Sequence, residues 1–185
     1  MALLVDTPTL ITGEELAEMS LDDSYELVQG RIVAMSPAGF THGEIEGRFY
    51  QALAAFVTTK GLGRVAVGEV GVYTQRNPDT VRGADVVYIS HERYQQVTSG
   101  SFLDVAPEII VEVMSPSNTW SEVTQKLREY FVAGVELVWV ADPEVNIVYA
   151  YRSLTDVREF TDEDDLPGDD ILPGFSVPVA SLFEV

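Results

Sequence analysis

The sequence contains no cysteine, only two lysines, and no apolar run approaching the roughly 20 residues that cross a bilayer as a helix. Without cysteine, disulfides and thiolate metal sites are excluded. The first residues, Met-Ala-Leu-Leu-Val-Asp, lack the basic segment and long apolar stretch of a signal peptide. We therefore expect a cytoplasmic protein with no membrane partner.

Basic residues are scarce throughout the chain. Eleven Lys and Arg oppose 30 Asp and Glu, for a net charge of −19, which works against nucleic-acid binding because phosphates must be neutralised. The acidity is uneven: residues 1–30 hold seven acids and no Lys or Arg, whereas residues 31–150 hold fourteen acids and nine bases. A nuclease would have to work from a local basic patch. The alternative interpretation of the acidic ends is a solvated, repelling surface.

Apolar patterning predicts one domain over residues 1–185, with a mixed sheet flanked by helices (α/β or α+β class). The near-continuous apolar runs 107–114 and 135–141 flank a helix at 120–133, a pattern typical of a parallel βαβ unit. Capping-box patterns begin at Thr12, Thr41 and Thr119. We expect an acidic loop at about 161–170. Further strands are predicted at 25–35 (two strands with a turn at Gln29-Gly30), 64–74, 81–89 and 147–151, and further helices at 12–19 and 41–60.

Two carboxylates lie in strands that are otherwise apolar. Asp85 is in the run Ala-Asp-Val-Val-Tyr-Ile, and Glu112 is in the run Ile-Ile-Val-Glu-Val-Met. An ionised carboxylate in such a strand is unfavourable unless a cation or a metal compensates it. Carboxylates on adjacent strands could hold one Mg²⁺, which lowers the pKa of a bound water and stabilises charge on a phosphoryl group.

Lys126 lies on the edge of the apolar stripe of helix 120–133, three residues after Val123 and four before Tyr130. It could reach the strand end that carries Glu112 and orient a water or neutralise developing charge. Structural alternatives stay open. Lys126 could extend its ammonium to water, Asp85 could pair with Arg82, and Glu112 could pair with Lys126 as a buried salt bridge.

Several segments together resemble the Uma2 family, also called DUF820, over roughly residues 10 to 183. They are Tyr25-Glu-Leu-Val-Gln-Gly-Arg-Ile32, His42-Gly43, Arg82-Gly-Ala-Asp85-Val86, Pro107-Glu-Ile-Ile-Val-Glu112-Val-Met-Ser-Pro-Ser117, Lys126-Leu-Arg-Glu-Tyr130 and Gly134-Val-Glu-Leu-Val-Trp139-Val-Ala-Asp142-Pro143. That family is placed in the PD-(D/E)XK restriction-endonuclease-like superfamily.

The resemblance implies a restriction-endonuclease-like mixed sheet and a Mg²⁺-dependent (or Mn²⁺-dependent) nuclease acting on DNA as a homodimer. Asp85 would be the first acid and Glu112 the second, with metal ligation by Asp85, Glu112 and the Val113 carbonyl. Two positions depart from the superfamily motif: Ala84 replaces the Pro before the first acid, and Met114 occupies the place of the motif lysine. Lys126 would take that lysine's role from the helix.

Four residues are expected to support this site. His42 and Glu44 open the helix at 41–60, Glu69 is on the strand paired with that of Asp85, and Tyr130 lies one turn from Lys126. Capping, solvent exposure and core packing are their alternative roles. Two other functions stay open for the whole chain: a catalytically inactive interaction module with a nuclease fold, and a metal-dependent hydrolase of a small phosphorylated molecule.

Overall fold

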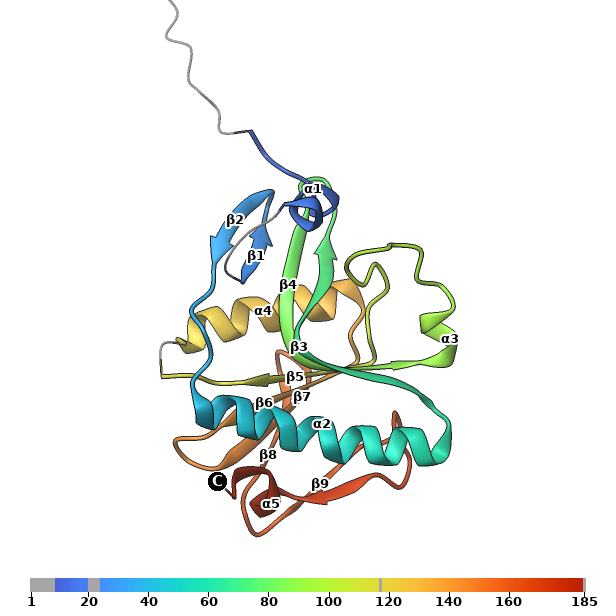
Figure 1. Ribbon diagram of the computed structural model, residues 1–185. Helices are drawn as coiled ribbons and strands as arrows, with labels where there is room; N and C mark the ends of the chain where they lie inside the picture. The colour runs from blue at the N-terminus through green and yellow to red at the C-terminus, as the bar shows by residue number, and fades with distance from the viewer. Residues whose placement is uncertain (1–8, 20–23, 117, 185) are drawn as a thin grey trace, which may run out of the picture.

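The computed structural model describes residues 9–19, 24–116 and 118–184. Helices and strands alternate irregularly along the chain (Figure 1). In order they are α1 (Gly13–Glu18), β1 (Tyr25–Val28), β2 (Arg31–Ala34), α2 (Phe40–Lys60), β3 (Gly63–Gln75), β4 (Thr80–Ser90), α3 (His91–Tyr94), β5 (Ile109–Val113), α4 (Trp120–Ala133), β6 (Leu137–Asp142), β7 (Ile147–Ser153), β8 (Asp156–Phe160), β9 (Asp165–Pro167), β10 (Ser176–Pro178) and α5 (Val179–Phe183).

The main sheet is mixed, as its sequence predicts. Its strand order is β2-β1-β4-β5-β6-β7-β8, and β3 pairs with β4 off this path. Only β5 and β6 pair in parallel, joined through α4, and this confirms the βαβ unit. The other neighbouring strands of this sheet pair antiparallel.

Helices α2 and α4 cover opposite faces of this sheet (Figure 1). Residues Ile45, Phe49, Leu53 and Val57 of α2 pack on one face with Val111, Val113 and Trp139. Residues Val123, Leu127 and Tyr130 of α4 pack on the other face with Ile110, Val138 and Val140. The alternation along β5 therefore directs Glu112, which shares its strand face with Ile110, towards α4.

Strand β4 has two different neighbours on the side away from β3. Near its start, Val81 pairs with Leu27 of β1, and further along Val86 pairs with Val111 of β5. Between these points lie residues 82–85, whose neighbours on that side are side chains rather than a strand. The strand order thus places Asp85 where the sheet divides.

Local signals account for most element boundaries. The capping boxes at Thr12 and Thr119 are confirmed, with both reciprocal hydrogen bonds present. The predicted box at Thr41 is wrong: α2 begins at Phe40 after an N-cap Gly39 that makes no side-chain cap bond. Gln29 and Gly30 have φ of 50° and 74°, which fits the tight turn between β1 and β2.

The acidic stretch 161–170 is not wholly a loop, because β9 forms there and pairs with β10. Pairing with Ser176–Pro178 overrides the polar composition of the segment. Within the described ranges, every helix is too short or too polar to cross a membrane.

Candidate active site

Glu112 and Lys126 form a direct ion pair in the interior. Lys126 Nζ donates to Glu112 Oε2 at 2.8 Å, and the Tyr130 hydroxyl donates to Glu112 Oε1 at 2.6 Å. The Glu112 side chain is 13% exposed. Burial raises the pKa of Glu112, while the neighbouring ammonium opposes that rise. The three residues therefore meet, as the helix stripe predicts, and both oxygens of Glu112 are held.

The Lys126 ammonium does not extend to water. Besides Glu112, it donates to the Gly83 carbonyl at 3.0 Å and lies 3.2 Å from Glu26 Oε1. Burial disfavours its charge, but the Glu112 and Glu26 carboxylates outweigh that effect and raise the Lys126 pKa. The buried salt bridge is thus present, and it holds a charged ammonium at the surface of β4.

Asp85 lies beside this pair. Its Oδ2 accepts a 2.6 Å hydrogen bond from the Val113 backbone N–H, and its Oδ1 lies 3.4 Å from His42 Nε2. The interaction with Asp85 raises the pKa of His42, although burial opposes it. Asp85 does not pair with Arg82, as one alternative supposed, because that guanidinium binds Glu26 and Glu129. The charge of Asp85 still acts on its neighbours, since it raises the pKa of both Glu112 and Lys126.

Glu69 is directed inward by a β-bulge. The register of β3 against β4 shifts between Val67 and Val70, and Glu69 takes a left-handed φ of 54°. Bulges commonly re-aim a side chain next to an active site. An ideal Cβ on Gly83 would lie 2.5 Å from Glu69 Oε2, so the carboxylate sits directly over that glycine. Burial, and then the charge of Asp85, raises the pKa of Glu69 to about 6.

Glu46 completes the surroundings of Asp85 from helix α2. Burial, and then the Asp85 charge, raises its pKa. It lies four residues after His42, one helical turn, and this spacing is the sequence signal that could have identified it. Glu44, which the sequence favours as a supporting residue, is not joined to Asp85, Glu112 or Lys126 by any contact in the described ranges.

Several polar atoms around Asp85 lack a partner among the residues that the structure describes. They are Oε1 of Glu46, Oε2 of Glu69 and Nδ1 of His42, whose Nε2 makes the 3.4 Å contact with Asp85. Buried polar atoms without a partner are rare in native proteins and call for an unseen ligand, water or ion. Their oxygens belong to carboxylates, the ligand type that Mg²⁺ and Mn²⁺ favour.

These side chains are of the type that binds a divalent cation, but they are not already arranged around one. Within residues 9–19, 24–116 and 118–184, no three Asp, Glu or His side chains are arranged at metal-ligand distances. The carboxylates of Glu46 and Glu69 next to Asp85 nevertheless add negative charge that a bound cation would compensate. Metal binding would therefore need small movements of these side chains.

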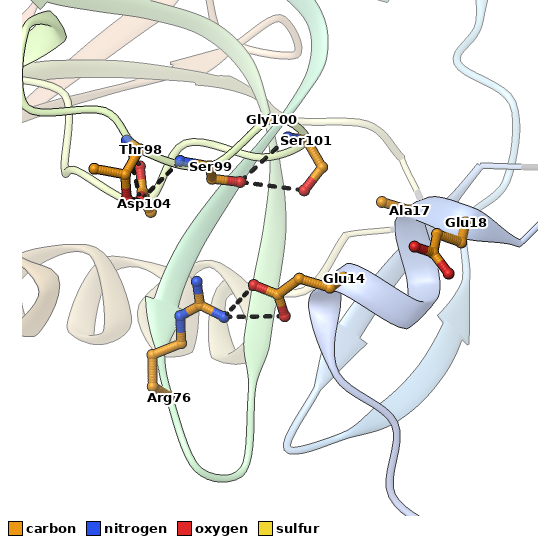
Figure 2. A pocket seen from close by; sticks show the side chains of 9 residues that line it. All are labelled: Glu14, Ala17, Glu18, Arg76, Thr98, Ser99, Gly100, Ser101 and Asp104. Carbon is orange, nitrogen blue, oxygen red and sulfur yellow. Dashed lines mark hydrogen bonds and ion pairs between the residues drawn. The ribbon is translucent and has the colours of Figure 1, made fainter.

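One surface cavity lies away from these residues. It has a volume of about 550 Å³ and lies between α1, the β3–β4 turn and the loop that follows α3. Figure 2 shows Arg76 directed towards Glu14 there, and its Nη1 donates to Glu14 Oε1 at 3.0 Å. Its lining is Glu14, Ala17, Glu18, Arg76, Thr98, Ser99, Gly100, Ser101 and Asp104.

A second hollow of about 240 Å³ borders the Asp85 centre through Glu69 and Gly83. Tyr25, Met35 and Phe102 contribute to its walls. A molecule in this hollow would contact the Glu69 carboxylate. Lys126 does not line the hollow, but it donates to the carbonyl of Gly83, which does. We therefore place the candidate active site at this hollow and not at the larger cavity.

The fold and the site define a class: a mixed α/β protein with buried carboxylates and one lysine where its central sheet divides. The family model "Uma2: Putative restriction endonuclease" matches residues 14–180. The chain belongs to the Uma2 family.

One solved structure shares the fold over nearly its whole length. It is described as "a putative nuclease belonging to DUF820" from Anabaena variabilis ATCC 29413. The two chains are 18% identical, with a TM-score of 0.76, and the match covers 92% of this chain and 95% of the other. No curated protein matches this chain.

Proposed function

We propose that this protein is a metal-dependent endonuclease that hydrolyses nucleic-acid phosphodiester bonds, with DNA as the first substrate to test. The observation that carries the proposal is the group of partnerless carboxylate oxygens of Glu46 and Glu69 beside Asp85. Family membership supports the same reaction class, because the family model carries the description "Putative restriction endonuclease".

Charge gives a separate reason to expect a metal. The centre contains the carboxylates of Glu26, Glu46, Glu69, Asp85, Glu112 and Glu129, against the permanent cations of Arg82 and Lys126. Both cations are already paired. A phosphodiester would be repelled from such a centre unless bound cations neutralised it.

The residues would divide the work as follows. Asp85 and Glu112, with the Val113 carbonyl, would hold Mg²⁺ or Mn²⁺, and Glu46 and Glu69 would add carboxylate oxygens. A bound ion would supply an activated water and stabilise charge on the phosphoryl group. The Lys126 ammonium would stabilise the charge that develops on the phosphoryl oxygens. Tyr130 fixes the orientation of Glu112, and the Val113 N–H fixes that of Asp85.

The proposal is tested with substitutions that keep the shape of each side chain. Asp85→Asn, Glu112→Gln and Lys126→Met should each abolish Mg²⁺- or Mn²⁺-dependent cleavage of single- and double-stranded DNA. Glu108→Gln is the matched control, because Glu108 is also buried and ion-paired, 3.3 Å from Arg93, but belongs to another cluster. It should retain cleavage.

Metal binding is measured without relying on activity. Binding of Mn²⁺ is followed by the loss of its free electron paramagnetic resonance signal, and Asp85→Asn should weaken it where Glu108→Gln does not. A wild-type protein that neither binds Mn²⁺ nor cleaves DNA or RNA would refute the proposal.

The net charge of −19 favours a second candidate function, hydrolysis of a small phosphorylated molecule. Such a substrate needs no basic groove, and the hollow of about 240 Å³ is large enough for a small ligand. Cleavage of bis(p-nitrophenyl) phosphate with no cleavage of nucleic acid would select this function. A homodimer, expected from the resemblance, stays a prediction that sedimentation measures.

A further inference from the structure

Glu26 lies at the centre of a network of donors around Lys126. It projects from β1 and is only 6% exposed. Its Oε2 accepts a 2.7 Å hydrogen bond from Arg82 Nη1, and its Oε1 accepts one of 3.1 Å from the Gly83 N–H. The same Oε1 lies 3.2 Å from Lys126 Nζ. Glu26 therefore contacts Lys126 both directly and through the strand segment that Lys126 binds.

The Lys126 ammonium has three N–H groups and three partners. The Gly83 carbonyl comes from β4, Glu112 comes from β5, and Glu26 comes from β1. Each partner thus comes from a different strand, and together they restrict the ammonium from three sides. If the Glu26 charge were absent, the ammonium would lose its partner on β1, and the remaining attraction of Glu112 would draw it towards β5.

Arg82 explains why Glu26 itself does not move. Its guanidinium forms a fork with Glu129, through Nε to Oε2 at 2.6 Å and Nη2 to Oε1 at 2.9 Å. Its remaining terminal nitrogen binds Glu26. Glu129 lies three residues after Lys126 on α4, so Arg82 joins β1 to the helix that carries the lysine.

We propose that Glu26 is a positioning residue, which together with Glu112 and the Gly83 carbonyl fixes the position of the Lys126 ammonium. In this arrangement the ammonium stays bound to the carbonyl of Gly83, a residue that lines the hollow beside Glu69. The inference rests on the proposed function for its catalytic consequence, but the position of Lys126 can be measured by itself.

The competing explanation is a purely structural ion-pair network that fastens β1 to α4. Glu26→Gln and Glu129→Gln separate the two explanations, because each removes one carboxylate charge from Arg82 while only Glu26 touches Lys126. A structural role predicts similar effects of both substitutions. A positioning role predicts that only Glu26→Gln alters Lys126.

The chain offers an internal reference, since its only lysines are Lys60 and Lys126. Trace acetylation at pH 8.5 followed by mass spectrometry gives the labelling rate of Lys126 relative to the exposed Lys60. An opposite charge within a few ångströms shifts a pKa by about one unit or more, so Glu26→Gln should raise the Lys126 to Lys60 ratio about tenfold. Glu129→Gln should leave the ratio within about twofold of wild type.

Kinetics provide the second readout. Glu26→Gln should lower kcat for DNA about tenfold or more, with KM unchanged or lower, because a displaced ammonium loses contact with developing charge. Glu26→Asp, which keeps the charge, should recover part of both the labelling ratio and kcat. If Glu26→Gln does not fold, the Lys126 to Lys60 labelling ratio of Glu26→Asp decides instead. The shorter aspartate cannot place its carboxylate where that of Glu26 lies, so a wild-type labelling ratio in Glu26→Asp refutes the inference.

The outcomes distinguish this inference from the proposed function. Wild-type protein that cleaves nothing refutes the proposed function, while a labelling change confined to Glu26→Gln still supports the positioning of Lys126. A labelling ratio that is equal in wild type, Glu26→Gln and Glu129→Gln refutes the positioning role, whatever the activity.

Discussion

Replacing Glu69 by glutamine should stabilise the metal-free protein at neutral and alkaline pH. The carboxylate lies in a bulge with a positive φ, its Oε2 has no partner among the described residues, and Asp85 repels it. Glutamine keeps the shape and removes the charge. A residue that destabilises the fold in this way is typical of a site retained for function.

The direction of this stability change follows from the pKa of Glu69, which rises from 4.5 to about 6 on folding. The folded state binds this proton more tightly than the unfolded state, so stability increases as the pH falls from 6 towards 4.5 and is lost as the pH rises through 6. The full shift corresponds to about 2 kcal/mol. Since solvent screens a side chain that is partly exposed, we expect about 1 kcal/mol at pH 8.

The assay is thermal unfolding in chelator at pH values between 4.5 and 8. For a chain of this size, about 1 kcal/mol raises Tm by roughly 2–4 °C, so Glu69→Gln should exceed wild type by that amount at pH 8 and match it near pH 4.5. Added Mn²⁺ should raise the Tm of wild type more than that of the variant. Glu163→Gln, in an exposed turn, controls for the loss of one negative charge.

A Glu69→Gln protein that is less stable than wild type at pH 8 would refute this reasoning. A stability difference between Glu69→Gln and wild type that is the same at every pH would also refute it, because it would show that the Glu69 carboxylate is already compensated in the folded state.

Other substitutions test the contacts of helix α4. Lys126→Met leaves Glu112 buried and uncompensated, so urea unfolding should show that the free energy of unfolding falls by about 3–5 kcal/mol. The double substitution with Glu112→Gln should recover much of this loss, and no recovery would contradict the pairing. Tyr130→Phe removes the 2.6 Å bond to Glu112 and should cost about 1–3 kcal/mol in the same assay. Thr119→Ala removes the cap of α4 and should cost about 1 kcal/mol by thermal unfolding, whereas an unchanged Tm would show that the capping box contributes nothing.

Much of the central unit can be predicted from local sequence. The apolar run around Glu112 predicts a buried strand, and the three- and four-residue spacing of Val123, Lys126 and Tyr130 predicts the helix face that meets it. Because a short connection returns α4 onto its own strand, spacing puts Lys126 within reach of Glu112, and the structure shows that the two residues pair.

The rest of the site depends on contacts between distant segments, which local patterns do not contain. Nothing near Glu26 in the sequence indicates that it meets Arg82 or Lys126, and the bulge that turns Glu69 inward has no fixed sequence pattern. The capping box predicted at Thr41 is also wrong. Helix α2 starts one residue earlier, at Phe40, so its N-cap is Gly39.

The division of the sheet at β4 affects how the protein matures during synthesis. Glu26 and Arg82 are separated by 56 residues in the chain, and Gly83 and Lys126 by 43. A ribosome-bound chain therefore holds Asp85 and Glu26 for some time before α4 exists to bring Lys126 between them. Until that helix has emerged, the chain lacks the ammonium that pairs with the carboxylates of the centre. The assembled centre is thus a late product of translation, formed only once the βαβ unit closes on the strands made before it.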